Sequence, residues 1–157
     1  MRAVSINYHN GFIQLVFDEI TNQEVEKPFW RLVSDPKWQN VDYDMKDAID
    51  RRDTQGRDPA LYAGKALEST IKIISNERGL STGRERGAKN YIDNLRSGGI
   101  LEAWEAETLE VFFKHVRNPL SHGPGAEELT SLSIPQTNWA IESCMSWIKS
   151  LIQRADN

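Results

Sequence analysis

The sequence feature that most constrains the fold is a helical repeat of apolar side chains between residues 58 and 79. Apolar residues recur there at spacings of three and four, which places them on one side of a helix. Asp58 is expected to cap the helix, Pro59 suits its first position, and Gly79 is typical of a helix end. The pattern therefore predicts a long amphipathic helix whose buried side consists of Ala60, Ala63, Leu67, Ile71 and Ile74.

Further helices are expected on both sides of this one. We predict a helix capped by Asp42, a helix over about 88–97 that ends at Gly98-Gly99, a helix over about 101–116, and a final helix that begins near Thr137-Asn138. The connections are short, so neighbouring helices should run antiparallel. The fold class predicted is all-α, a bundle of four core helices with an N-terminal helical extension.

The first forty residues carry weaker signals. Five apolar residues between 12 and 20 suit one face of a short helix that ends at Thr21-Asn22, and a second short helix is expected from about Glu24 to Val33. A short strand at residues 3–6 is the alternative. We therefore divide the chain into an extension, 1–40, which completes the fold or binds a partner, and a helical domain, 41–157.

Composition limits the class of protein. A chain of 157 residues is one domain in size, and 39% hydrophobic with 27% charged residues argues against a disordered tail and against a membrane protein. No apolar run approaches the roughly 20 residues that a bilayer requires, and no signal peptide is evident. The single cysteine, Cys144, excludes an internal disulfide and a cysteine-rich zinc site. We expect a soluble cytoplasmic protein without a membrane partner.

The net charge of −4 narrows the possible partners. Affinity for nucleic acid depends mainly on cationic contacts to phosphate. The acidic balance therefore argues against a tight, sequence-specific DNA-binding protein. It argues less against a nuclease, which needs positive charge only near its site.

The segment from Phe112 to Gly123 is the one that carries chemistry. An apolar helix is expected to end at Arg117, because Asn118 is a reasonable terminator and Pro119 does not continue a helix. His122 follows on a short loop, which extends to about Gln136. The expected result is a permanent cation and a titratable imidazole close together.

This pair of residue types suits RNA cleavage. RNA carries its own nucleophile, the 2′-hydroxyl group. Histidine transfers protons near neutral pH, and the planar guanidinium of arginine matches phosphate oxygens. One arginine and one histidine lack a second proton-transfer group, which the same segment of a second copy would supply at a two-fold axis.

The segment Arg117-x4-His122 resembles the signature of the HEPN superfamily. More narrowly, VRNPLSHG at 116–123 is similar to the C-terminal module of abortive-infection proteins, and DPALYAGKALESTIKIIS at 58–75 looks like an earlier helix of that module. The resemblance covers about residues 42–152. It implies a HEPN-like bundle, metal-independent ribonuclease activity without a cofactor, a homodimer, a toxin or phage-defence setting, and an antitoxin or other restraining partner.

The resemblance also implies roles for individual residues. Arg117 and His122 correspond to the catalytic pair, Asn118 to the polar residue that shapes the site, and Glu68 to the acidic position on the earlier helix. Helical geometry supports the last of these, because Glu68 falls at the edge of the apolar stripe, one turn beyond Gly64. A glycine there lets a neighbour approach, so Glu68 is expected to bind Arg117 or to orient His122.

Each of these residues also has a plainer interpretation. Arg117 and His122 suit a helix end and a loop, Asn118 a helix cap, and Glu68 a helix flank. The cations Arg84, Arg86, Lys89 and Lys114 form either a track for the RNA backbone or a solvated surface. A metal site built from His9, His115 and His122 lacks carboxylate partners, so no metal is expected.

Five aromatic residues are interpreted as core or interface, with Trp139 or Trp147 at a dimer contact; the other three are Trp104, Phe112 and Phe113.

An inactive dimerisation or regulatory module is the main alternative to a nuclease, and nucleotide binding in the same pocket is a weaker one.

Overall fold

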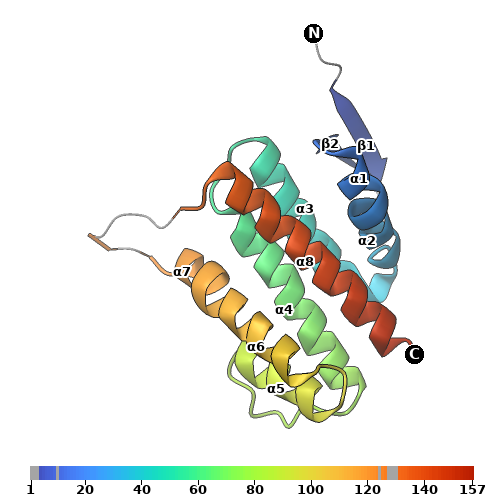
Figure 1. Cartoon of the computed structure of the whole chain (residues 1–157), viewed down its shortest axis with the longest axis vertical. Coiled ribbons are helices and arrows are strands. Elements are labelled where there is room, and N and C mark those ends of the chain that lie inside the picture. Colours follow the sequence, from blue (N-terminus) through green and yellow to red (C-terminus); the bar gives the residue numbers. More distant parts are fainter. Residues whose placement is uncertain (1–3, 10, 124, 127–130) are drawn as a thin grey trace.

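The computed structural model describes residues 4–9, 11–123, 125–126 and 131–157 (Figure 1). It is 69% helix and 6% strand, which confirms the all-α class apart from one hairpin. The elements, in chain order, are β1 Ser5–His9, β2 Phe12–Val16, α1 Glu19–Thr21, η1 Asn22–Glu26, α2 Lys27–Leu32, η2 Pro36–Trp38, α3 Gln39–Asp53, α4 Pro59–Glu77, α5 Ala88–Ser97, α6 Ala103–Phe112, η3 Phe113–Arg117, α7 Asn118–Ser121 and α8 Ile134–Ala155.

Helix α4 is the centre of the bundle. It packs against α3, α5, α8 and the segment η3, and Figure 1 shows it between α8 and the α5–α6 side. The predicted stripe of α4 is at most 1% exposed at every position, and Gly79 after it has φ +65°. The long amphipathic helix is thus confirmed. Asp58 precedes the helix at φ 52° and makes no capping hydrogen bond with its side chain, so its predicted capping contact is wrong.

Other predicted helices are present with shifted boundaries. Helix α3 begins at Gln39, so Asp42 lies in its first turn and pairs with Lys46 instead of capping it. Helix α8 begins at Ile134, one turn earlier than expected, because Ser133 and Gln136 form a reciprocal capping box. Within the described ranges, none of the helices has the length and apolar character needed to cross a bilayer.

The N-terminal region corrects one prediction. Residues 5–9 and 12–16 pair as two antiparallel strands, here called the hairpin, so the helix expected between residues 12 and 20 is wrong. The two residues between the strands are Asn10 and Gly11, and Gly11 has φ +76°. Glycine adopts this left-handed conformation without strain, so Gly11 suits the position directly before β2. The chain then turns helical through α1, η1 and α2, without the expected end at Thr21-Asn22.

A buried polar contact fastens the hairpin to the helices. The Gln14 side chain is fully buried; its amide donates to Glu26 Oε2 at 2.5 Å, and its Oε1 accepts from the Trp30 indole at 3.0 Å. Glu26 is 5% exposed. Burial raises the pKa of Glu26 to about 7, although the charge of Arg52 and the hydrogen bond from Gln14 act in the opposite direction.

This carboxyl group makes stability depend on pH. Since the pKa of Glu26 is higher in the folded state than in the unfolded chain, the folded state retains the proton between about pH 4.5 and pH 7. The free energy of unfolding should therefore fall by about 2–3 kcal/mol as pH rises through that window. Glu26→Gln should remove this fall, measured by urea unfolding at a series of pH values. Glu24→Gln, at an exposed position of the same segment, should leave it unchanged.

Candidate functional site

The helix that carries Arg117 does not end there. The backbone N–H of Asn118 donates to Phe113 O, five residues back, so η3 is one wide π turn, and α7 continues the helix to Ser121. The prediction of a loop from Asn118 to about Gln136 is therefore wrong for its first four residues, and residues 124 and 127–130 lie outside the described part. In an α-helix the Pro119 ring would meet the carbonyl group four residues back, and a π turn relieves that contact.

The Arg117 guanidinium is held between two helices. Its Nη2 donates to Glu68 Oε2 on α4 at 2.6 Å, and its Nη1 donates to Asn118 Oδ1 at 3.3 Å. Glu68 Oε1 pairs with Lys72 Nζ at 3.0 Å, so the carboxylate binds two cations. Both partners of the central pair are largely buried, with the Arg117 side chain 22% and the Glu68 side chain 13% exposed. The expected contact between Glu68 and Arg117 is thus confirmed, whereas a catalytic role stays a prediction.

Gly64 gives Arg117 its place against α4. A Cβ atom at Gly64 would lie 2.5 Å from Arg117 Cγ, closer than atoms can pack, and 3.1 Å from its Cβ, which is a tight contact. The arginine stem therefore lies directly on the backbone of α4, one turn before Glu68. The expectation that Gly64 allows a neighbour to approach is confirmed.

Gly64→Ala should show how tightly this contact is packed. In a helix interior the substitution alone would stabilise by about 1 kcal/mol, but here the methyl group meets the arginine stem, so we expect a net loss of about 1–3 kcal/mol. Most of that loss should vanish when Gly64→Ala is combined with Arg117→Ala, because the Cγ atom is then gone. Urea unfolding of the four chains of this double-mutant cycle measures the coupling, and additive effects would contradict the packing.

His122 lies apart from this cluster. It follows the last residue of α7 in an extended conformation, φ −98° and ψ 137°, and it is exposed. No hydrogen bond or ion pair of its ring occurs among residues in the described ranges. Within one chain, then, the structure gathers Glu68, Arg117 and Asn118 and leaves His122 outside the cleft that they line.

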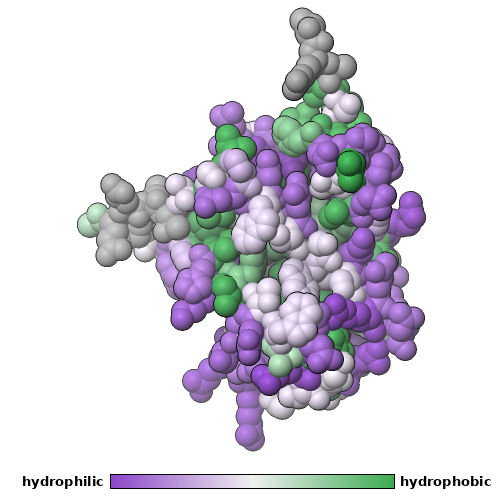
Figure 2. Space-filling view, viewed as in Figure 1, coloured by the Kyte–Doolittle hydropathy of each residue, from purple (hydrophilic) through white to green (hydrophobic). Residues whose placement is uncertain are grey.

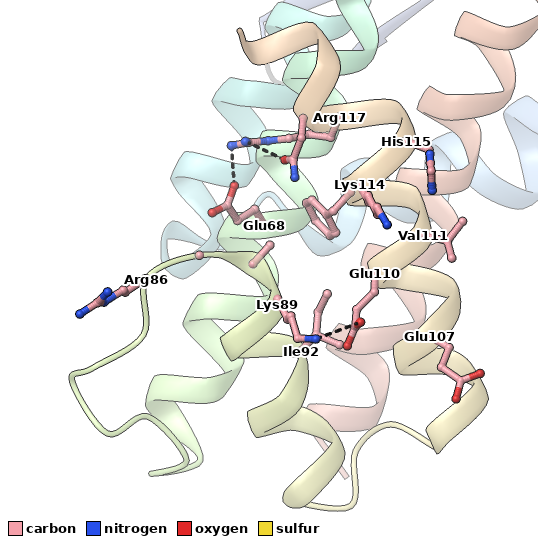
Figure 3. A pocket seen from close by; sticks show the side chains of 14 residues that line it. Glu68, Arg86, Lys89, Ile92, Glu107, Glu110, Val111, Lys114, His115 and Arg117 are labelled. Carbon is pink, nitrogen blue, oxygen red and sulfur yellow. Dashed lines mark hydrogen bonds and ion pairs between the residues drawn. The ribbon is translucent and has the colours of Figure 1, made fainter.

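That cleft has a volume of about 820 Å³ and lies between α4, α5 and α6 with η3 (Figure 3). Ile92 and Phe113 contribute apolar surface. Its charged lining comprises four cations, Arg86, Lys89, Lys114 and Arg117, and three carboxylates, Glu68, Glu107 and Glu110. Four minus three leaves +1, so the cleft is positive although the chain carries −4.

The predicted cationic track is divided by the structure. Arg86, Lys89 and Lys114 line the cleft, whereas Arg84 does not. Lys89 is also 3.6 Å from Glu110, which reduces the charge it presents. His115 is exposed and lines the cleft, but in Figure 3 its ring points away from the Arg117–Glu68 pair.

The aromatic residues are less buried than their assignment to core or interface suggests. Trp104 is 64% and Trp139 53% exposed, whereas Phe112 and Phe113 are buried. The Trp139 ring lies 6.2 Å from the Phe112 ring, beside the helix that carries Arg117. The contact of Trp139 or Trp147 with a second copy stays a prediction. In the part of the chain that the structure covers, no group of three or more His, Cys, Asp and Glu residues is arranged to hold a metal ion.

Comparison of the chain with models of known families, with curated proteins and with solved structures finds no match.

Proposed function

We propose that the chain is a metal-independent endoribonuclease of the HEPN type that acts as a homodimer. The observation that carries the proposal is the fixed guanidinium: Arg117 is seated on Gly64, bonded to Glu68 and open to a positive cleft. A guanidinium has five N–H donors, and only two make the hydrogen bonds described above. Donors on the terminal nitrogens therefore remain for phosphate oxygens.

In this mechanism the RNA supplies the nucleophile. The 2′-oxygen attacks the adjacent phosphorus, the 5′-oxygen leaves, and the products end in a 2′,3′-cyclic phosphate and a 5′-hydroxyl group. His122 accepts the 2′-hydroxyl proton or donates a proton to the leaving oxygen. Arg117 neutralises charge on the phosphoryl group, and Glu68 and Asn118 set its orientation.

A second copy supplies what one chain lacks. Cleavage of this kind benefits from two proton-transfer groups, and His122 of one chain is exposed at the end of α7. Two such ends at a two-fold axis bring two histidines to one substrate, one copy reaching toward the cleft of the other. The exposed Trp139, next to Phe112, supplies apolar surface for that contact. The resemblance to abortive-infection proteins suggests a toxin or phage-defence setting with a restraining partner.

The proposal is tested by RNA cleavage in EDTA. Arg117→Ala and His122→Ala should each lower the cleavage rate by at least about 100-fold, because one removes charge neutralisation and the other proton transfer. Arg84→Ala, which changes an exposed arginine that does not line the cleft, should keep most of the activity. Product ends are identified by their sensitivity to a cyclic phosphodiesterase. Cleavage that persists in both the Arg117 and the His122 variant would refute the proposal.

Binding of RNA supplies a separate test of the cleft. Arg86→Ala should weaken binding of single-stranded RNA and reduce the slope of log K against log salt by roughly 0.7, the share of one phosphate contact. Arg84→Ala is the matched control, since Arg84 is also exposed but does not line the cleft. Equal effects of the two variants would show that the cleft does not direct the RNA.

An inactive regulatory module is the second candidate, and the position of His122 outside the cleft favours it. It predicts a stable dimer or a partner complex with no cleavage of any RNA by the unaltered chain.

A further inference from the structure

The hairpin turns an apolar face to solvent, whereas its inner face combines polar groups with Phe12, whose ring lies 6.0 Å from that of Trp30. In the register of the two strands, Ile6 pairs with Leu15 and Tyr8 with Ile13, so these four side chains share one face. Ile6, Tyr8 and Ile13 are 60%, 75% and 61% exposed. Val4 and Phe17 continue the alternation at either end, and they are 73% and 65% exposed.

The opposite face is anchored by polar groups. Asn7 pairs with Gln14, and both point inward: Asn7 donates its amide to Asn22, and Gln14 bonds to Glu26 and Trp30. These contacts determine which face of the hairpin turns outward. The face that is left outward is apolar and exposed, which indicates a surface that another molecule covers.

The outer edge of β2 and the outer edge of β1 differ in whether the protein covers them. The backbone N–H of Leu15 donates to Asp53 Oδ2 at 3.2 Å, so the outer edge of β2 is covered by the end of α3. Because that N–H points away from β1, Ile6 and Leu15 form a pair without mutual hydrogen bonds. The backbone groups of Ile6 and, two residues on, Tyr8 therefore point away from β2 as well. No hydrogen bond to this outer edge of β1 is found within the described ranges.

We infer that this face, defined as Val4, Ile6, Tyr8, Ile13, Leu15 and Phe17 and here called the hairpin face, packs against the hairpin face of a second copy. Two features select a copy of the same chain. Residues 3–17 contain no Asp, Glu, Lys or Arg. Arg52 of α3 places its guanidinium 4.7 Å from the Phe17 ring, at one end of the hairpin face, so repulsion between like charges is confined to that end when the face meets itself. Flat sheet faces also stack on one another about 10 Å apart, and a two-fold axis pairs each residue with its counterpart reciprocally.

The size of the hairpin face agrees with this occupant. Its exposed side chains present on the order of several hundred Å² per copy, approaching the roughly 800 Å² that each partner of a stable complex contributes. Figure 2 shows the apolar surface at the hairpin end of the molecule. The hairpin and α7 lie on opposite sides of the bundle in Figure 1, so the contact is separate from the proposed pairing of His122. A chain that makes both two-fold contacts forms a tetramer or a larger assembly.

Sedimentation velocity over a wide concentration range tests the inference. Ile13→Lys should halve the mass of the assembly or raise its dissociation constant at least about tenfold, because each copy then buries an unpaired charge. Tyr8→Thr, in which the new residue also has a high strand propensity, should likewise weaken the assembly. Trp104→Lys is the matched control: Trp104 is 64% exposed, at the start of α6 and at the far end of the molecule from the hairpin.

Each outcome is decisive. A wild-type chain that stays monomeric throughout, or an assembly whose mass and affinity are unchanged in Ile13→Lys and Tyr8→Thr, overturns the inference. Circular dichroism verifies that each variant is folded. RNA cleavage is measured on the same samples, and its absence would refute the proposed nuclease without bearing on the hairpin face.

Discussion

The ion pair between Arg117 and Glu68 is the interaction on which the candidate site depends. Its geometry requires three features at once: a residue without a side chain at position 64, a carboxylate one turn later on α4, and a π turn that brings Arg117 to that point. A largely buried guanidinium would be costly without a partner, and Glu68 removes that cost while Lys72 shares the carboxylate. The site is therefore built on the most deeply packed helix of the bundle, which restricts the movement of the arginine.

The two ends of the chain differ in how they are stabilised. The bundle is held by apolar side chains of α4 and α8 that are completely buried. The hairpin is held by a short polar chain, Gln14, Glu26 and Trp30, in which one carboxyl group has a pKa near neutrality. Polar networks of this kind specify orientation more than they add stability, since every buried group must keep its partner. The attachment of the hairpin thus depends on the protonation of Glu26.

Much of the fold was predictable from the sequence, because helical periodicity records burial on one face. The stripe of α4, the glycines that end α4 and α5, and the approach at Gly64 followed from spacing alone. Boundaries that depend on local hydrogen bonds did not: the capping box at Ser133 and the π turn before Pro119 have no periodic signal. The hairpin was not predicted, although Asn-Gly at positions 10 and 11 is a common turn sequence. The apolar residues between 12 and 16 were interpreted as one face of a helix, and their alternation along a strand was not considered. For the site, the contact of Glu68 with Arg117 was one of the two roles predicted for Glu68, and the structure shows it. The position of His122 outside the cleft depends on α7, a helix that was not predicted because proline was expected to end the preceding one.

The π turn at η3 has a consequence for everything that follows it. A wide turn holds one residue more than an α-helical turn, so it changes the direction in which each later side chain leaves the helix axis by roughly 100°. The chain thereby turns Arg117 inward while Leu120 is still buried and the residues after it emerge on the surface. A related protein that lacked a single residue in this turn would keep the same motif residues, but their side chains would point in other directions and contact other groups. The sequence of such a motif therefore indicates where its side chains point only when the number of residues in the preceding turn is also the same.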